Sequence, residues 1–371
     1  MIDDNVGDLA LRSVNLRRHA VVLTRAPDEV TVSDLRKANV VLIDYRIAHW
    51  PGREKVTSIS LQPSNGVALG AVLRSYADEH IPEKRRAFAI HSGVLHDLGG
   101  GLPARSREHA IARTLNLEWV FPKQGDPDAP PLENQVAVLA KAVKALPRTW
   151  PETPKRASDV LSKLLKTPLQ VSWGARAAAD VESSHPPIHA WATATNGMAF
   201  IRWLLHHILP YPSFLWDERY LAARLHVSAE SLRRVLAGET KARRTLAPFR
   251  YQGVLEDFLG TRWWRTGVEQ LLWNWTSGNP FNVDAVREAA RTRISTDLDH
   301  LALMRPVVCV DPQSFRPTDR VVDAADAVEI RPDDWPPYAE QAWVPATEVA
   351  GEEGLIALVV PQDRDRAEGP A

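Results

Sequence analysis

The chain has 371 residues, of which 44% are hydrophobic and 25% are charged, and its formal net charge is −1. This balance is typical of a globular protein with more than one domain, and it excludes an overall charge that would attract nucleic acid or a membrane surface. The single cysteine excludes an internal disulfide and a cysteine-based zinc site, and it favours a cytoplasmic protein. No apolar run approaches 18 residues, so we expect no membrane association.

Residues 1–147 alternate between short apolar runs and segments with helical spacing. The apolar runs lie at 19–24, 39–44, 86–93 and 117–123, and the helical segments at 31–38, 65–80, 106–116 and 133–146. Continuous apolar strands between amphipathic helices indicate a parallel sheet that is covered on both faces. With a short first strand at Met1 and Ile2, the pattern predicts an α/β fold with a doubly wound, five-stranded parallel sheet.

The rest of the chain divides into three parts by composition. Residues 148–155 are rich in proline and read as a linker. Helical periodicity fills 156–300 and predicts a mainly α-helical domain. Short strand-like runs between proline- and aspartate-rich turns predict a small β-rich segment over 301–371.

Polar side chains follow the predicted strands of the first domain. These are Asp3, Asp4, Asp44, Ser92 and Lys123. Functional groups collect at the carboxyl ends of the strands in an open parallel sheet. Three neighbouring carboxylates repel one another unless a divalent cation lies among them, and oxygen ligands suit Mg²⁺. An aspartate beside that cation can attack a phosphoryl group, whose oxygens then need donors such as a hydroxyl and an ammonium group.

The order of the motifs "DD" (3–4), "LIDY" (42–45), "NG" (65–66), "AIHSG" (89–93) and "FPK" (121–123) resembles the receiver domain of two-component response regulators. The resemblance covers residues 1–147 and implies a flavodoxin-like receiver fold. It implies the following roles: Asp44 as the phosphoacceptor, Asp3 and Asp4 with Asp44 as the Mg²⁺ ligands, Ser92 and Lys123 as the groups that stabilise the phosphoryl group, and Gly66 as a turn glycine.

The expected partner is a histidine kinase, and the expected function is a signalling switch that acts on the helical domain. Such a protein is regulatory rather than an enzyme, with at most self-phosphorylation and dephosphorylation.

Three departures from the family pattern support an alternative. The acidic pair begins at residue 3, the segment 45–65 is longer than the family's loop, and Pro122 precedes Lys123 where the family has the opposite order. These features also fit a pseudo-receiver that acts as a scaffold without phosphate.

The segment 217–238 has the spacing of a helix-turn-helix, which gives a second alternative, a DNA-binding transcriptional regulator. Residues 217–250 contain eight basic and four acidic side chains, enough to attract a phosphate backbone locally. The candidate nucleic-acid contacts are Arg233, Arg234, Lys241, Arg243 and Arg244. A protein partner that binds the helical domain and a homodimer remain open.

Overall fold

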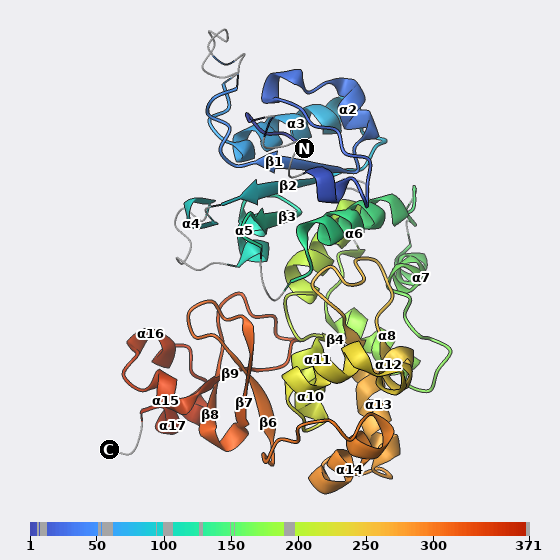
Figure 1. Cartoon of the computed structure of the whole chain (residues 1–371), viewed down its shortest axis with the longest axis vertical. Coiled ribbons are helices and arrows are strands. Elements are labelled where there is room, and N and C mark those ends of the chain that lie inside the picture. The colour runs from blue at the N-terminus through green and yellow to red at the C-terminus, as the bar shows by residue number, and fades with distance from the viewer. Residues whose placement is uncertain are drawn as a thin grey trace. The chain divides into compact units, whose positions relative to one another are not determined.

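The structure is a computed structural model. It describes residues 1–5, 7, 13–50, 53, 62–93, 95–98, 107–125, 129–148, 150–151, 153–188 and 197–368. Parts of the expected linker (149 and 152) and most of the 51–61 stretch lie outside these residues. Two compact units make up the chain (Figure 1). The first comprises Met1–Leu165, Pro186–Pro210 and Gly253–Gly260, and the second comprises Lys166–His185, Tyr211–Gln252 and Thr261–Ala371. The four-part domain division drawn from the sequence stays a prediction.

The first unit is built on a parallel sheet of three strands in the order β1-β2-β3. The strands are β1 (Val40–Asp44), β2 (Ala87–Ser92) and β3 (Trp119–Pro122). The helices of this unit are η1 (Pro27–Glu29), α2 (Val32–Lys37), α3 (Gly66–His80), α4 (Leu95–Leu98), α5 (Glu108–Thr114), α6 (Leu132–Ala145), α7 (Pro154–Leu165), α9 (Met198–Trp203) and η6 (Leu204–Ile208).

Apolar side chains cover the sheet on both faces. On one face Ile43 and Phe88 lie in a core cluster with residues of α3 and α5. On the other face Phe258 packs edge-on against Trp119 and Phe121, with ring centroids 5.1 and 6.3 Å apart. This double coverage is the reason why the strands read as continuous apolar runs.

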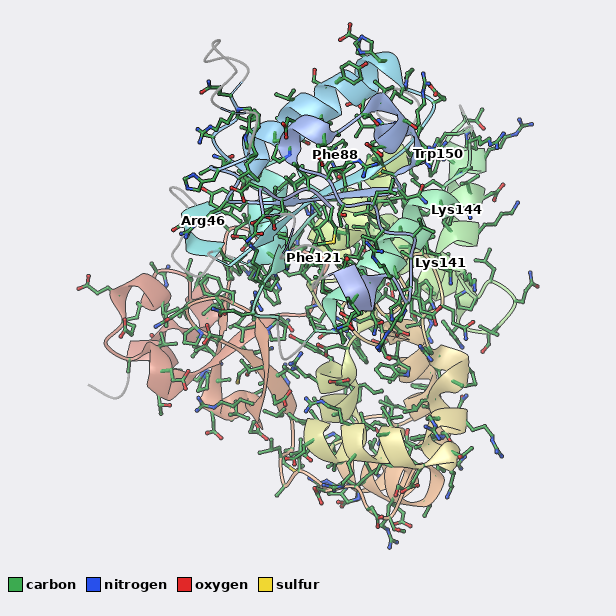
Figure 2. The ribbon with its side chains drawn as sticks, turned by 45° about the horizontal axis from the view of Figure 1, so that its top comes forward. Arg46, Phe88, Phe121, Lys141, Lys144 and Trp150 are labelled. Carbon is green, nitrogen blue, oxygen red and sulfur yellow. The ribbon has the colours of Figure 1, made fainter. Side chains whose placement is uncertain are left out.

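Helix α6 illustrates how the sequence pattern divides buried from exposed faces. Its residues Leu139 and Val143 are buried, whereas Lys141 and Lys144 are exposed. Figure 2 shows both lysines on the outer side of the helix, and it labels Phe88 and Phe121 among the strands.

The predicted five-stranded doubly wound sheet is wrong. The segment 19–24 forms no strand, and the first strand is reduced to Ile2, which makes isolated parallel bridges to Arg25 and Ile43. The physical reason is the short stretch before the acidic pair, because one bridging residue cannot sustain a ladder of hydrogen bonds on either side. Small sheets of three, two and four strands are present instead.

The second unit contains a helical part and a four-stranded sheet. Its helical part consists of α8 (Gly174–Ser183), α10 (Glu218–Arg224), α11 (Ala229–Gly238), α12 (Thr240–Leu246), η7 (Ala247–Phe249), α13 (Arg265–Trp275) and α14 (Val283–Arg293), with a two-stranded sheet of β4 (Leu215–Trp216) and β5 (Trp263–Trp264). The larger sheet has the order β7-β6-β9-β8. Its strands are β6 (Pro306–Val310), β7 (Pro317–Asp323), β8 (Ala327–Ile330) and β9 (Ala342–Pro345), accompanied by η8 (Ala324–Asp326), α15 (Ala346–Val349), α16 (Glu353–Ile356), η9 (Pro361–Asp363) and α17 (Arg364–Glu368). No helix among the described residues is long and apolar enough to cross a bilayer.

Candidate functional site

Three carboxylates come together at the carboxyl end of β1. Asp44 is the last residue of this strand, and Ile2 lies beside it, with hydrogen bonds from Ile2 N to Leu42 O (2.9 Å) and from Asp44 N to Ile2 O (2.8 Å). This pairing places Asp3 and Asp4 next to Asp44. One carboxylate oxygen from each of the three residues lies within 4.8 Å of the others. The single bridging residue of the first segment is therefore enough to assemble the acidic cluster.

Little of the surface of these three charged side chains is accessible to water. Asp3 and Asp44 are buried, with 4% and 7% of their surface exposed, and Asp4 is half-buried. Burial raises the pKa of the Asp3 carboxyl to about 6, a hydrogen bond from Asn5 N opposes the change, and the nearby Asp44 charge adds to it. The raised pKa therefore comes mainly from burial, which disfavours the charged form of a carboxyl group.

Lys123 supplies the positive charge that the structure does contain. Its Nζ atom lies 2.7 Å from Oδ1 and 2.9 Å from Oδ2 of Asp44. The backbone places it there, because β3 pairs with β2 in parallel and Lys123 N donates to Ser92 O at 2.8 Å. Although Pro122 precedes Lys123, the ammonium group still reaches the carboxylate of the neighbouring strand end.

The other predicted residues lie around the same edge of the sheet. Ser92 ends β2 and is 1% exposed. Gly66 begins α3 beside Asp44, and a Cβ atom added to it would lie 2.0 Å from the backbone oxygen of Asp44. Only glycine permits this close approach of helix and strand end. The Asn65 side chain caps the helix by accepting a hydrogen bond from Ala68 N at 3.0 Å.

The donor set fits a hard divalent cation. Three carboxylates and one ammonium group leave a formal surplus of negative charge, and carboxylate oxygens are the ligands that Mg²⁺ and Ca²⁺ take in proteins. Two oxygens bound to one Mg²⁺ stand at most about 4.2 Å apart, and the oxygens of the cluster lie within 4.8 Å of one another, close to this separation. Asp3, Asp4 and Asp44 would hold the ion, and Lys123 would lie beside it.

A second buried carboxylate in the same unit was missed by sequence reasoning. Glu118 is fully buried directly before β3. Arg74 contacts it through two nitrogens at 3.0 and 3.2 Å, and Arg202 at 2.7 Å. Its carboxylate also accepts a hydrogen bond from Phe88 N. The available signal was a charged residue inside the apolar run "LEWVF", but the two arginines are distant in sequence.

The carboxylate of Glu118 is ionised despite its burial. Burial raises the pKa of this carboxyl, but the charges of Arg74 and Arg202 outweigh that effect, and the pKa is lowered. The neighbouring His206 ring contacts Glu118 O at 3.0 Å, and burial lowers the pKa of that imidazole to about 4. The group is a structural network in which two guanidinium groups compensate one buried carboxylate.

In the second unit, α10 and α11 are joined by residues 225–228. Asp217 and Ser228 cap the two helices, and His226 takes a left-handed backbone conformation (φ 55°) at the position where a turn glycine is usual. Tight helix pairs of this kind occur in many helical proteins, so this geometry leaves DNA binding a prediction.

The candidate nucleic-acid contacts are spread over α11 and α12, and most already have partners. Arg233 contacts Glu218 at 2.6 Å and also Asp319, and the hydrogen bond to Asp319 raises its pKa. Arg234 contacts Asp299, and Lys241 and Arg243 donate to backbone carbonyls. Arg244 is exposed. A phosphate backbone would compete with these internal contacts.

The comparisons with known proteins do not extend these observations. The prediction of a receiver domain is wrong, because the sheet has three strands where that family's fold needs five. No family model, no curated protein and no solved structure matches the chain.

Proposed function

We propose that this chain is cytoplasmic, that its acidic cluster binds Mg²⁺ and that Asp44 accepts a phosphoryl group from the phosphohistidine of a histidine kinase. The phosphorylated chain then acts as a signalling switch that regulates the helical region 156–300. The support comes from the site itself and not from membership of a family.

The observation that carries the proposal is the position of Asp44 between one ammonium group and two further carboxylates. Its carboxylate is 2.7 Å from the Lys123 ammonium group and shares an oxygen cluster within 4.8 Å with Asp3 and Asp4. A bound Mg²⁺ would supply charge neutralisation for phosphoryl oxygens. Lys123 would then exchange its contact with the carboxylate for a contact with the phosphoryl group.

In the proposed step an oxygen of Asp44 attacks phosphorus. A P–O bond forms, the P–N bond to the donor imidazole breaks, and the bonding electron pair leaves with that nitrogen, which takes up a proton. The buried position of Ser92 beside Lys123 at the same edge would place a hydroxyl donor near the transferred group.

The test uses phosphoramidate, a small donor with the same P–N bond, together with Mg²⁺ and the full chain. We expect intact-mass analysis to show one added phosphoryl group. Asp44→Asn should abolish the adduct, and Asp97→Asn, which changes a partly exposed carboxylate of the same unit, should retain it. Omission of Mg²⁺ or addition of a chelator should also abolish it.

An unchanged mass in the presence of measurable Mg²⁺ binding would overturn phosphoryl transfer and favour the phosphate-independent scaffold. An adduct that persists in Asp44→Asn would place the modification elsewhere. Absence of Mg²⁺ binding in calorimetry would remove the premise of the site.

A further inference from the structure

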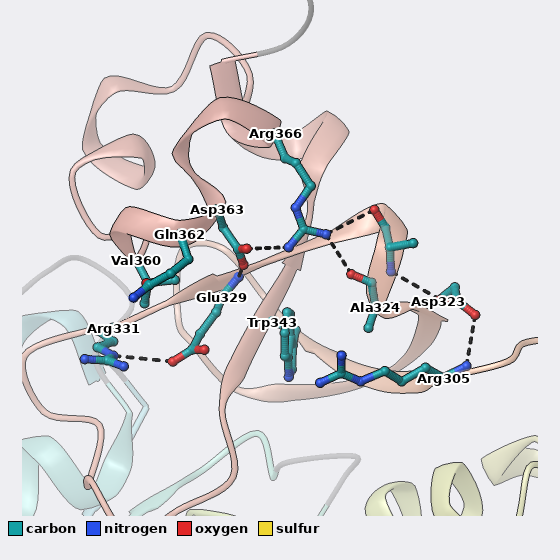
Figure 3. Close-up of a pocket in the computed structure, with 11 residues that line it drawn as sticks. Arg305, Asp323, Ala324, Glu329, Arg331, Trp343, Val360, Gln362, Asp363 and Arg366 are labelled. Carbon is teal, nitrogen blue, oxygen red and sulfur yellow. Dashed lines mark hydrogen bonds and ion pairs between the residues drawn. The ribbon is translucent and has the colours of Figure 1, made fainter. Parts of the chain in front are cut away.

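The second unit contains a cavity of about 480 Å³ on one side of its four-stranded sheet (Figure 3). This volume falls within the range of pockets that bind small molecules, roughly 300–1,000 Å³. Its lining residues come from β7, η8, β8, β9, η9, α17 and the residues that flank β6, β8 and η9. The charged and aromatic members are Arg305, Asp323, Glu329, Arg331, Trp343, Asp363 and Arg366.

The carboxylates of the pocket are held by neighbouring backbone groups. Asp323 accepts hydrogen bonds from the backbone N–H groups of Met304 (2.8 Å), Arg305 (3.0 Å) and Ala325 (3.2 Å). These contacts, with that of Arg305 named first among the causes, lower the pKa of the Asp323 carboxyl. Its charge therefore serves to fix the chain around η8.

Two of the arginines are also engaged. Arg366 pairs with Asp363 and donates to the carbonyl oxygens of Ala324 (3.0 Å) and Ala325 (3.2 Å). Arg331 contacts Glu329, with 3.3 Å between Nε and Oε1. These groups hold the walls of the pocket together, as the dashed lines in Figure 3 show.

Two N–H donor groups remain without a protein acceptor. Within the described part of the chain, the guanidinium group of Arg305 and the indole N–H of Trp343 form no hydrogen bond or ion pair, although both residues line the cavity. Trp343 is 9% exposed, and its indole nitrogen is not fully enclosed by protein atoms. In Figure 3 the guanidinium group of Arg305 extends toward Trp343.

We propose that this pocket binds a small organic carboxylate. The planar guanidinium group of Arg305 matches a carboxylate with two parallel N–H donors, and the Trp343 indole supplies a third. One guanidinium group without a hydrogen-bond acceptor favours a ligand with a single negative charge. A doubly charged phosphate would meet repulsion from Asp323, Glu329 and Asp363, which line the same cavity.

The proposal is independent of phosphoryl transfer at Asp44, and it is tested by calorimetry on the full chain with three ring compounds. The probes are benzoate, the uncharged benzyl alcohol and the doubly charged phenyl phosphate. We expect benzoate to bind saturably at one site and more tightly than both other compounds. Arg305→Ala should weaken benzoate at least about tenfold, because charge-assisted hydrogen bonds contribute about 1.5–3 kcal/mol.

A second variant and a control separate the pocket from general charge effects. Trp343→Phe keeps a large ring, removes the N–H donor, and should weaken benzoate about threefold or more. Arg320→Ala removes an exposed arginine of the same sheet that pairs with Glu348 outside the pocket, and it should bind like the unmodified chain. No benzoate binding, equal binding by Arg305→Ala, or tighter binding of phenyl phosphate would each overturn the proposal.

Discussion

Two buried carboxylate sites of the first unit have opposite electrostatics. Glu118 is surrounded by the guanidinium groups of Arg74 and Arg202, and its pKa is lowered. Asp3 lies beside two other aspartates with a single lysine nearby, and burial raises its pKa to about 6. Both sites are at strand ends and both are removed from solvent.

The balance between negative and positive side chains distinguishes a structural site from a candidate ligand site. At Glu118 the protein's own cations complete the network, so there is no driving force to bind another one. At the acidic cluster the negative charge exceeds the positive charge, and the proposed binding of a cation there would stabilise the folded chain. Variants that alter one site or the other should therefore differ in their stability and in their affinity for Mg²⁺.

The largest effect is expected from Glu118→Ala. This change leaves Arg74 and Arg202 without a counter-charge in a buried network, and loss of one partner of such a network costs about 3–5 kcal/mol. Chemical denaturation followed by circular dichroism should show this loss of unfolding free energy. Glu79→Ala, an exposed carboxylate on α3, is the matched control and should change stability by less than about 0.5 kcal/mol. Equal stabilities of the two variants would contradict a structural role for Glu118.

Gly66→Ala should have the next largest effect and should act on the acidic cluster. The added Cβ atom would lie 2.0 Å from the backbone oxygen of Asp44, so the strand end or α3 must shift. We expect a loss of about 1–3 kcal/mol in stability, as for other overpacked positions, and weaker Mg²⁺ binding in calorimetry.

Gly70→Ala is the control on the same helix. Its Cβ atom would contact only the Ile43 Cδ1 atom at 3.2 Å, which is the end of a flexible side chain. We expect Mg²⁺ binding to be retained. If both variants bound Mg²⁺ as tightly as the unmodified chain, the contact between Gly66 and Asp44 would not control the cluster.

The three strands with complete apolar runs could be predicted from the sequence. The number of strands in the sheet could not. The runs containing Val40–Asp44, Ala87–Ser92 and Trp119–Pro122 form β1, β2 and β3, because a continuous apolar run between turns is a local property of the sequence. The run 19–24 looked similar but formed no strand. Its pairing depends on a neighbouring strand, and one bridging residue, Ile2, was too little to provide it.

The sequence also indicated which carboxylates converge, because strand ends share an edge of a parallel sheet. Asp3, Asp4, Asp44 and Lys123 do lie together. The contacts of Glu118 were beyond reach, since Arg74 and Arg202 are 44 and 84 residues away in the chain. Contacts at such separations depend on how the helices pack, which local patterns do not encode.

A smaller effect is expected in the pH dependence of stability. With rising pH, the acidic cluster should lower the free energy of unfolding and the Glu118 network should raise it. The folded pKa of Asp3 is about 6, above its ordinary value of 3.8, so its contribution is present at low pH and lost as the pH rises toward 6. His206, next to Glu118, has a folded pKa of about 4, below its ordinary value of 6.5, so its contribution grows as the pH rises from 4 to 6.5.

Asp3→Asn isolates the first contribution. We expect the unfolding free energy of this variant to rise more steeply between pH 4 and 6 than that of the unmodified chain, by about 1–2 kcal/mol over the interval once solvent screening is considered. Saturating Mg²⁺ should reduce this difference in slope between pH 4 and 6, because the ion competes with the proton for the same carboxylate. Parallel curves in the absence of Mg²⁺ would show that Asp3 is solvated like an ordinary aspartate.

The smallest change in stability is expected from Lys123→Gln. This variant removes the cation of the acidic cluster and so tests the difference between the two sites directly. Lys123 is the cation that occupies the place beside Asp44, whereas Arg74 and Arg202 do the same for Glu118. The pair is partly exposed, so its loss should cost about 1 kcal/mol or less without Mg²⁺.

Removal of the competing ammonium group leaves more negative charge for Mg²⁺, and calorimetry should show tighter Mg²⁺ binding by a few fold. The same variant should accept phosphoryl groups more slowly, because the transferred oxygens lose a donor. Tighter metal binding together with slower transfer would separate the two roles of Lys123, whereas weaker Mg²⁺ binding would mean that the lysine positions the carboxylate for the ion.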